Sequence, residues 1–124
     1  MPRDYSKIIA WQRAHQLVLR VYQETKAFPS EERFALIDQM RRAAYSVPAN
    51  IAEGTGRDSQ KDYLRYLVMA LGSLKELEYF LLLSKDLGYL SVENHQGLLA
   101  DLCSVASPLQ GLIKSVKTEI AEPE

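Results

Sequence analysis

Apolar residues recur every three or four positions along four long segments of this chain. That spacing places them on one face of an α-helix, as Ala14, Leu17, Val18 and Val21 show in the first segment. The four segments span residues 6–27, 31–53, 60–87 and 92–117. The connections between the segments are short, and no part of the chain alternates apolar and polar residues as a strand does. The sequence therefore predicts an all-α fold. We expect a single domain over residues 1–124, an antiparallel up-down four-helix bundle.

Serine, glycine and proline residues mark the expected helix ends and bends. A serine precedes three of the segments, as N-cap residues do: Ser30, Ser59 and Ser91. Gly88 follows the third segment, where a C′ glycine commonly ends a helix. Pro48 and Pro108 lie inside the second and fourth segments. A proline removes one backbone hydrogen bond and clashes with the preceding turn, so we expect proline kinks in both helices.

The third segment carries more apolar residues than one helix face can hold. From Tyr63 to Leu83, 15 of 21 residues are apolar. The expected core face consists of Leu64, Leu67, Ala70, Leu71, Leu74, Leu77, Leu81 and Leu82. Five large side chains fall outside that face: Tyr66, Met69, Tyr79, Phe80 and Leu83. We interpret these five as an interface between copies in a homo-oligomer, since a helix that is apolar almost all round is usually buried almost all round. The alternative is that a monomer tolerates them as exposed residues.

Charge is distributed unevenly along a chain whose net charge is only −1. Residues 1–66 hold 11 Lys and Arg against 8 Asp and Glu, a balance of +3, and residues 67–124 hold 4 against 8, a balance of −4. A polyanion is therefore expected on the first half, with RNA or DNA as a possible partner. The nucleic-acid-binding candidates are Arg41, Arg57, Lys61 and Arg65. The alternative for each of them is a solvated charge on a helix surface.

A ridge of polar side chains surrounds Pro48 on the second segment. It consists of Gln39, Arg42, Ser46, Asn50 and Glu53, at spacings of three and four. We interpret it as a structural polar network in which Asn50 satisfies backbone groups freed near the proline. Glu53 lies in the last turn of a helix, where the dipole disfavours an acid, so we expect Arg42 or Arg57 to pair with it. The alternative is that the arginines point outward and hold phosphate or an acidic partner.

The residues that could carry catalysis or hold a metal are sparse. His15 and His95 stand on different predicted helices without a second ligand at metal-binding spacing. Cys103, the single cysteine, falls near the core stripe of the fourth segment and is expected to be a buried thiol. We therefore expect no catalytic residues, no metal, no cofactor and no enzymatic activity. No signal peptide or membrane-spanning run is recognised, so a cytoplasmic protein without membrane contact is expected.

The chain resembles a known family through three strings of residues. These are residues 28–32 (FPSEE), residues 39–54 (QMRRAAYSVPANIAEG) and residues 70–76 (ALGSLKE). They are similar to the small bacterial four-helix-bundle proteins encoded in intervening sequences of the 23S ribosomal RNA gene, the S23-like family. That resemblance implies an up-down bundle assembled as a homopentamer. It also implies a relation to the accessory proteins of diversity-generating retroelements, which bind nucleic acid through basic surfaces. Here the pI of about 6.1 departs from a uniformly basic surface.

Two classes of function follow from these observations. The first is a non-enzymatic homo-oligomeric bundle, a pentamer by resemblance, that binds RNA or DNA. The alternative is a structural or protein-interaction module that binds no nucleic acid. A binder that repeats a weakly positive surface in several copies gains from multivalency and loses affinity steeply with added salt.

Overall fold

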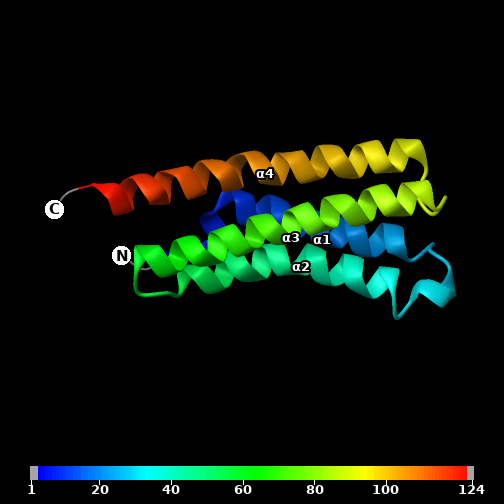
Figure 1. Ribbon diagram of the computed structural model, residues 1–124, viewed down its shortest axis with the longest axis horizontal. Coiled ribbons are helices and arrows are strands. Elements are labelled where there is room, and N and C mark those ends of the chain that lie inside the picture. The colour runs from blue at the N-terminus through cyan, green and yellow to red at the C-terminus, as the bar shows by residue number, and fades with distance from the viewer. Residues whose placement is uncertain (1–2, 123–124) are drawn as a thin grey trace.

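The computed structural model describes residues 3–122, and four α-helices account for most of them. The helices are α1 (Ile9–Thr25), α2 (Leu36–Thr55), α3 (Gln60–Asp86) and α4 (Val92–Ala121), with short 3-10 helices at Tyr5–Lys7 and Ser30–Glu32. Over residues 3–122 there is no strand, so the predicted all-α class is confirmed. Figure 1 shows α1 and α3 running one way along the long axis, with α2 and α4 returning.

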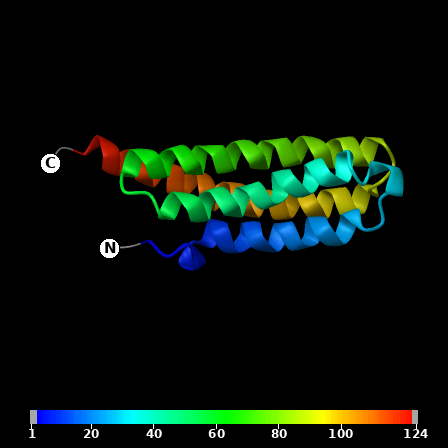
Figure 2. The ribbon, with the colours of Figure 1, turned by 90° about the horizontal axis from the view of Figure 1, so that it is seen from below.

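Each helix packs against two neighbours, so the four helices form a ring in cross-section. α1 contacts α2 and α4, and α3 contacts the same two helices from the opposite side. The view in Figure 2 shows all four lying along a common axis. Both the beginning of α1 and the end of α4 lie at the same end of the bundle as the α2–α3 turn (Figure 1). The turn from α2 to α3 therefore shares that end with the N-terminal segment.

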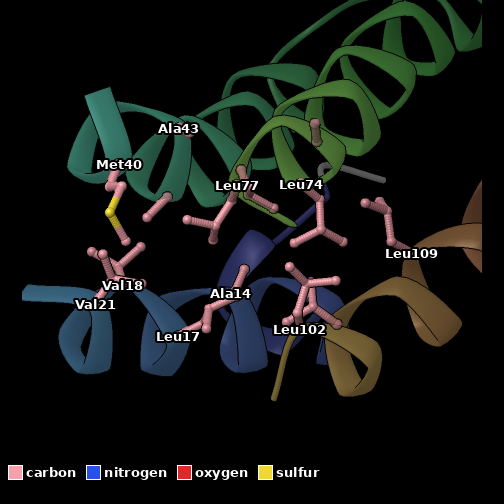
Figure 3. Packing of buried hydrophobic residues seen from close by; sticks show 14 of the residues in the cluster. Ala14, Leu17, Val18, Val21, Met40, Ala43, Leu74, Leu77, Leu102 and Leu109 are labelled. Carbon is pink, nitrogen blue, oxygen red and sulfur yellow. The ribbon is translucent and has the colours of Figure 1, made fainter. Parts of the chain in front are cut away.

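The core lies on the axis of the bundle and is lined mainly by leucine. The leucines of α3 that point inward (Leu67, Leu74, Leu77 and Leu81) are almost completely buried. Figure 3 shows Leu74 and Leu77 facing Leu102 and Leu109 of α4 and the apolar face of α1. Met40 lies near Val18 and Val21 in the same view, and its sulfur accepts a hydrogen bond from Ser84 Oγ at 3.2 Å. One continuous core thus joins all four helices.

Local capping chemistry determines how α3 and α4 begin and how α3 ends. Ser59 and Ser91 accept hydrogen bonds at 3.0 Å from the backbone N–H groups of Asp62 and Asn94, which confirms both predicted N-caps. At the other end of α3, Gly88 has φ 84°, and its N–H donates to Lys85 O. This left-handed glycine confirms the predicted C′ position, because other residues rarely adopt that conformation.

The beginning of α2 differs from the prediction. The expected start at residue 31, with Ser30 as N-cap, is wrong, because residues 30–32 form a separate 3-10 turn and α2 begins at Leu36. Phe34, which falls inside the predicted helical segment 31–53, is 88% exposed. It precedes the helix, so helical spacing does not apply to it. Burial of Leu36 and Ile37 determines where the helix starts, and no side chain caps α2 at its N-cap residue, Ala35.

The other helix boundaries and two core assignments also need correction. α1 is shorter than expected, and α4 extends four residues beyond the predicted end, to Ala121. Leu82 and Cys103 were expected in the core, and both are exposed. Each lies at the edge of its helix's apolar stripe, where a small rotation of the helix decides between core and solvent. α2 and α4 continue through Pro48 and Pro108, and the kinks at these residues stay predictions.

Truncating a core leucine tests this packing. Leu74→Ala should lower the free energy of unfolding by about 2–5 kcal/mol, because it leaves a cavity where the side chain is 1% exposed. Leu19→Ala, on the outer face of α1, removes the same atoms from a side chain that is 51% exposed and should change it by only about 0.5 kcal/mol. Urea unfolding followed by circular dichroism measures both. Equal losses in the two variants would contradict the core assignment.

Candidate functional site

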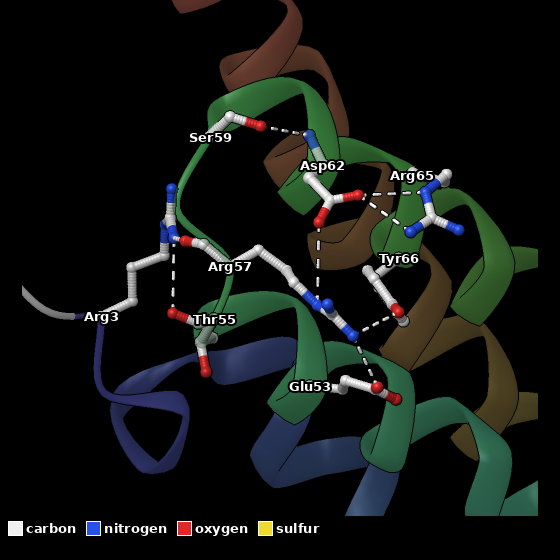
Figure 4. Close-up of polar contacts among 8 residues, drawn as sticks. All are labelled: Arg3, Glu53, Thr55, Arg57, Ser59, Asp62, Arg65 and Tyr66. Atoms are coloured by element: carbon white, nitrogen blue, oxygen red, sulfur yellow. Dashed lines mark hydrogen bonds and ion pairs between the residues drawn. The ribbon is translucent and has the colours of Figure 1, made fainter.

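The turn between α2 and α3 gathers most of the charged candidates around Tyr66. Arg57 Nη2 donates to Glu53 Oε1 at 2.8 Å and also to the Tyr66 hydroxyl, and Arg57 Nε lies 3.7 Å from Asp62 Oδ2 (Figure 4). Arg65 donates to the other oxygen of Asp62, with Nη2 at 2.9 Å. The predicted pairing of Glu53 with an arginine is therefore made by Arg57. Because these pairs are partly exposed, solvent screens them, and they orient the side chains more than they stabilise the fold.

Tyr66 lies under this cluster and is buried within its own chain. The guanidinium carbons of Arg57 and Arg65 lie 4.5 Å and 4.8 Å from the centre of its ring. The ring was predicted to face another copy, and that prediction is wrong, since the arginines and α2 cover it instead. The hydrogen bonds from Arg65 to Asp62 and the nearby carboxylate charge raise the pKa of Arg65 above its ordinary value. Hydrogen bonds to carboxylates hold both guanidinium groups in place beside the ring.

Gly54 allows α2 and α3 to approach closely below this cluster. A Cβ at residue 54 would lie 2.9 Å from Tyr66 Cβ and 3.0 Å from Tyr63 Cδ1, both closer than ordinary contact distances. The Tyr63 ring is buried in turn beneath Arg3, whose guanidinium carbon lies 4.2 Å from its centre. Arg3 Nη1 also donates to Arg57 O at 2.9 Å, so the N-terminal segment is fastened to the α2–α3 turn. Burial raises the pKa of Tyr63, and the cation of Arg3 opposes that shift.

An open cleft of about 550 Å³ lies at the N-terminus of α3. It is lined by Gly56, Arg57, Asp58, Ser59, Lys61, Asp62 and Arg65. Three of the four predicted nucleic-acid candidates therefore share one cleft, with two acids among them. Lys61 is exposed and forms no ion pair with an acid of residues 3–122, in contrast to Arg57 and Arg65.

Arg41, the fourth candidate, holds two helices together. Its Nε donates to Thr25 Oγ1 at 3.0 Å, its Nη2 donates to Tyr22 O at 3.4 Å, and its guanidinium carbon lies 4.5 Å from the centre of the Tyr22 ring. These contacts fasten α2 to the end of α1. Arg41 is therefore already engaged with its own chain, and the structure does not bring it together with the other three candidates.

The predicted polar ridge divides into separate parts. Asn50 Nδ2 donates to Ser46 O at 2.8 Å and to Ser46 Oγ at 3.0 Å, and Ser46 Oγ is hydrogen-bonded to Ser73 Oγ of α3 at 2.9 Å. This trio joins α2 to α3 as a network, although Asn50 binds the carbonyl of Ser46 and not that of Ala44, which Pro48 frees. Glu53 belongs to the Arg57 cluster. Gln39 and Arg42 are exposed and line a groove of about 360 Å³ between α2 and α3.

The predicted interface residues of α3 are only partly exposed. Met69 and Tyr79 are exposed, Phe80 and Leu83 are half-buried, and Tyr66 is buried. Val68 and Leu82, which the sequence did not place in an interface, are exposed as well. Val68, Met69, Tyr79 and Leu82 are between 42% and 58% exposed, and we call these four residues the outer ridge of α3.

A second groove of about 360 Å³ lies beside the outer ridge, between α3 and α4. It is lined by Lys75, Glu78, Tyr79, Leu82, His95 and Leu99. His95 is buried, and its Nε2 has no hydrogen-bond partner among the described residues. Within residues 3–122, no group of three or more His, Cys, Asp or Glu side chains could hold a metal ion. None of the described helices is both long and apolar enough to span a membrane.

The four long helices, with α2 and α3 in close contact at Gly54, define this chain as a small four-helix-bundle protein. Residues 6–111 match the family of 23S rRNA-intervening sequence proteins, and the chain belongs to that family. A crystal structure of a protein of unknown function from the S23 ribosomal protein family of Bacteroides thetaiotaomicron is similar, with a TM-score of 0.79 and 25% sequence identity. The match covers 86% of this chain and 96% of that one. No curated protein matches the chain. Neither match indicates an enzymatic family.

The close approach of α2 and α3 at Gly54 predicts that a side chain added at this residue destabilises the protein. Gly54→Ala should lower the free energy of unfolding by about 1–2 kcal/mol, because the strain of the new contacts exceeds the better helix propensity of alanine. Gly111→Ala, in α4, places its Cβ in open space and should raise that free energy by about 0.5–1 kcal/mol. Thermal unfolding of the two variants beside the parent chain measures the difference. A stabilised Gly54→Ala protein would contradict the contact.

Proposed function

We propose that this protein is a non-enzymatic, self-associating helical bundle, with five copies as the expected number. The outer ridge of α3 carries the proposal. Its four large apolar side chains face solvent on α3, more than any other helix of residues 3–122 exposes. Gly72 and Lys75 lie between Val68 and Tyr79 on the same side of α3, so the ridge is apolar toward its two ends. Large apolar side chains exposed on one side of a small protein commonly mark a protein–protein contact. Copies related by symmetry can cover this ridge on every subunit at once.

Three features of the outer ridge support a contact between copies. Its residues are large and apolar, as the centres of interfaces are. They extend from Val68 to Leu82, about four helical turns, long enough for one helix to lie along another. The groove beside the ridge is walled by Leu82 and Leu99 and offers a recess for side chains of a second subunit. A cytoplasmic location is part of the proposal, supported by the exposed, unpaired thiol of Cys103, which suits a reducing compartment.

The second candidate function is nucleic-acid binding at the cleft of α3. Arg57, Lys61 and Arg65 gather around this cleft at a helix N-terminus, where backbone N–H groups and the helix dipole favour anions. Asp58 and Asp62 lie in the same cleft and offset two of the three positive charges. A single subunit therefore offers a weak site. Repetition over several subunits raises its avidity, so this candidate depends on the proposed assembly.

A matched pair of leucine substitutions tests the assembly. The parent chain should have the mass of an oligomer at micromolar concentration, and Leu82→Asp should give smaller species, because a charge cannot be buried unpaired in an apolar interface. Leu19→Asp introduces the same charge at a similarly exposed leucine on α1 and should leave the mass unchanged. Size-exclusion chromatography with light scattering measures all three. A parent chain that runs as a monomer would end the proposal.

A charge reversal at Lys61 tests the second candidate. Lys61→Glu should weaken binding to a labelled single-stranded RNA pool and lower the slope of log affinity against log salt by about 0.7, since one phosphate contact is lost. Lys114→Glu reverses an exposed charge on α4 and serves as the control. Fluorescence anisotropy at several salt concentrations measures both slopes. Identical behaviour of the two variants would favour the structural or protein-interaction module without nucleic acid.

A further inference from the structure

Hydrogen bonds hold two side chains in place in the groove between α2 and α3, a surface that the proposed assembly does not use. It is lined by Gln39, Arg42, Ala43, Tyr45, Ser46, Ala49, Asn50 and Glu76. Two of these, Ala43 and Ala49, are small, which leaves room between the helices. Ser46 and Asn50 are fixed by hydrogen bonds to each other, and Ser46 also bonds Ser73. Side chains held in this way are pre-organised, so a ligand would meet a fixed surface.

Two opposite charges line this groove without pairing. Arg42 and Glu76 are both exposed, and neither forms an ion pair with any residue from 3 to 122. The arginine next to it in sequence, Arg41, is engaged with α1, and Arg57 and Arg65 are paired with acids. Arg42 therefore keeps its guanidinium donors free for a phosphate or carboxylate, which it can bind in a bidentate manner.

The remaining groups supply an aromatic surface and hydrogen-bond acceptors. The Tyr45 side chain is 45% exposed, and within residues 3–122 its ring forms no stacking or cation–π contact. Asn50 uses its amide nitrogen on Ser46, which leaves its Oδ1 available as an acceptor in the groove that Glu76 also lines. A free cation, an exposed aromatic ring and fixed acceptors are together the groups that recognise an unstacked nucleotide.

We propose that this groove binds one unpaired nucleotide of a single-stranded nucleic acid. Arg42 binds the phosphate, the base stacks on Tyr45, and Glu76 with Asn50 Oδ1 accepts hydrogen bonds from an amino group of the base. Uracil has no amino group and offers these acceptors only its single N3–H, so the groove should prefer adenine, cytosine or guanine. The proposal deepens the second candidate function and rests on it. Asn50 of the groove lies about two helical turns before Gly56, which lines the cleft at Lys61, so the two sites follow each other along the chain.

Anisotropy with labelled ten-nucleotide strands tests the site. Oligo-C and oligo-A, as RNA and as DNA, should bind the parent chain several-fold more tightly than oligo-U, and comparison of the RNA and DNA strands identifies the natural sugar. Tyr45→Ala should weaken oligo-C binding at least five-fold, and Tyr45→Phe should retain it, because stacking needs only the ring. Arg42→Gln should weaken all strands, and Glu76→Gln should reduce the preference for oligo-C over oligo-U. Tyr5→Ala, at a similarly exposed tyrosine outside the groove, should bind normally.

The outcomes separate this site from the proposed function. If Lys61→Glu weakens binding while Tyr45→Ala and Arg42→Gln bind as the parent does, the cleft stands and the groove site is overturned. If the parent binds no strand at all, both nucleic-acid proposals fall together. If Arg42→Gln or Tyr45→Ala changes the mass in light scattering and leaves the affinity per subunit unaltered, the groove is a contact between copies and the nucleotide site is overturned.

Discussion

Burial of one face of α3 is the interaction on which the rest of this structure depends. Because α3 packs against both α2 and α4, four of its leucines are almost fully buried: Leu67, Leu74, Leu77 and Leu81. Each such side chain contributes about 1.5–3 kcal/mol relative to exposure. Because this face fixes the rotation of α3, it also determines which residues of that helix turn outward. The outer ridge, with Tyr79 and Leu82, is the direct consequence.

The same rotation determines the polar surfaces on either side of the α2–α3 pair. It brings Tyr66 against Gly54 and under two arginines, and it brings Ser73 to Ser46. Arg57 and Arg65, whose charges would be free on an isolated helix, are thereby paired with acidic residues of the same chain. Of the four predicted nucleic-acid candidates, Lys61 is the one that forms no ion pair or side-chain hydrogen bond within residues 3–122.

The sequence predicted features that depend on local chemistry, and it missed those that depend on neighbours. Helical spacing predicted four helices, and the caps at Ser59, Ser91 and Gly88 follow from residues within one turn. The rotation of one helix against another is not a local property. Arg41 was expected to be free for a ligand and Arg42 to join the polar network, but Arg41 is bonded to α1 and Arg42 is exposed, because adjacent residues point about 100° apart on a helix. Tyr66, Leu82 and Cys103 were misplaced by the same small rotations, and Phe34 by a helix that starts five residues late.

The central claim is that another copy covers the outer ridge of α3. Hydroxyl-radical labelling read by mass spectrometry measures the solvent exposure of individual side chains, at protein concentrations above and below those needed for assembly. Tyr79 and Leu82 should become protected as the concentration rises, while Leu19 on α1, similarly exposed in the single chain, should stay reactive. Equal labelling of Leu19 and Leu82 at every concentration would contradict the account.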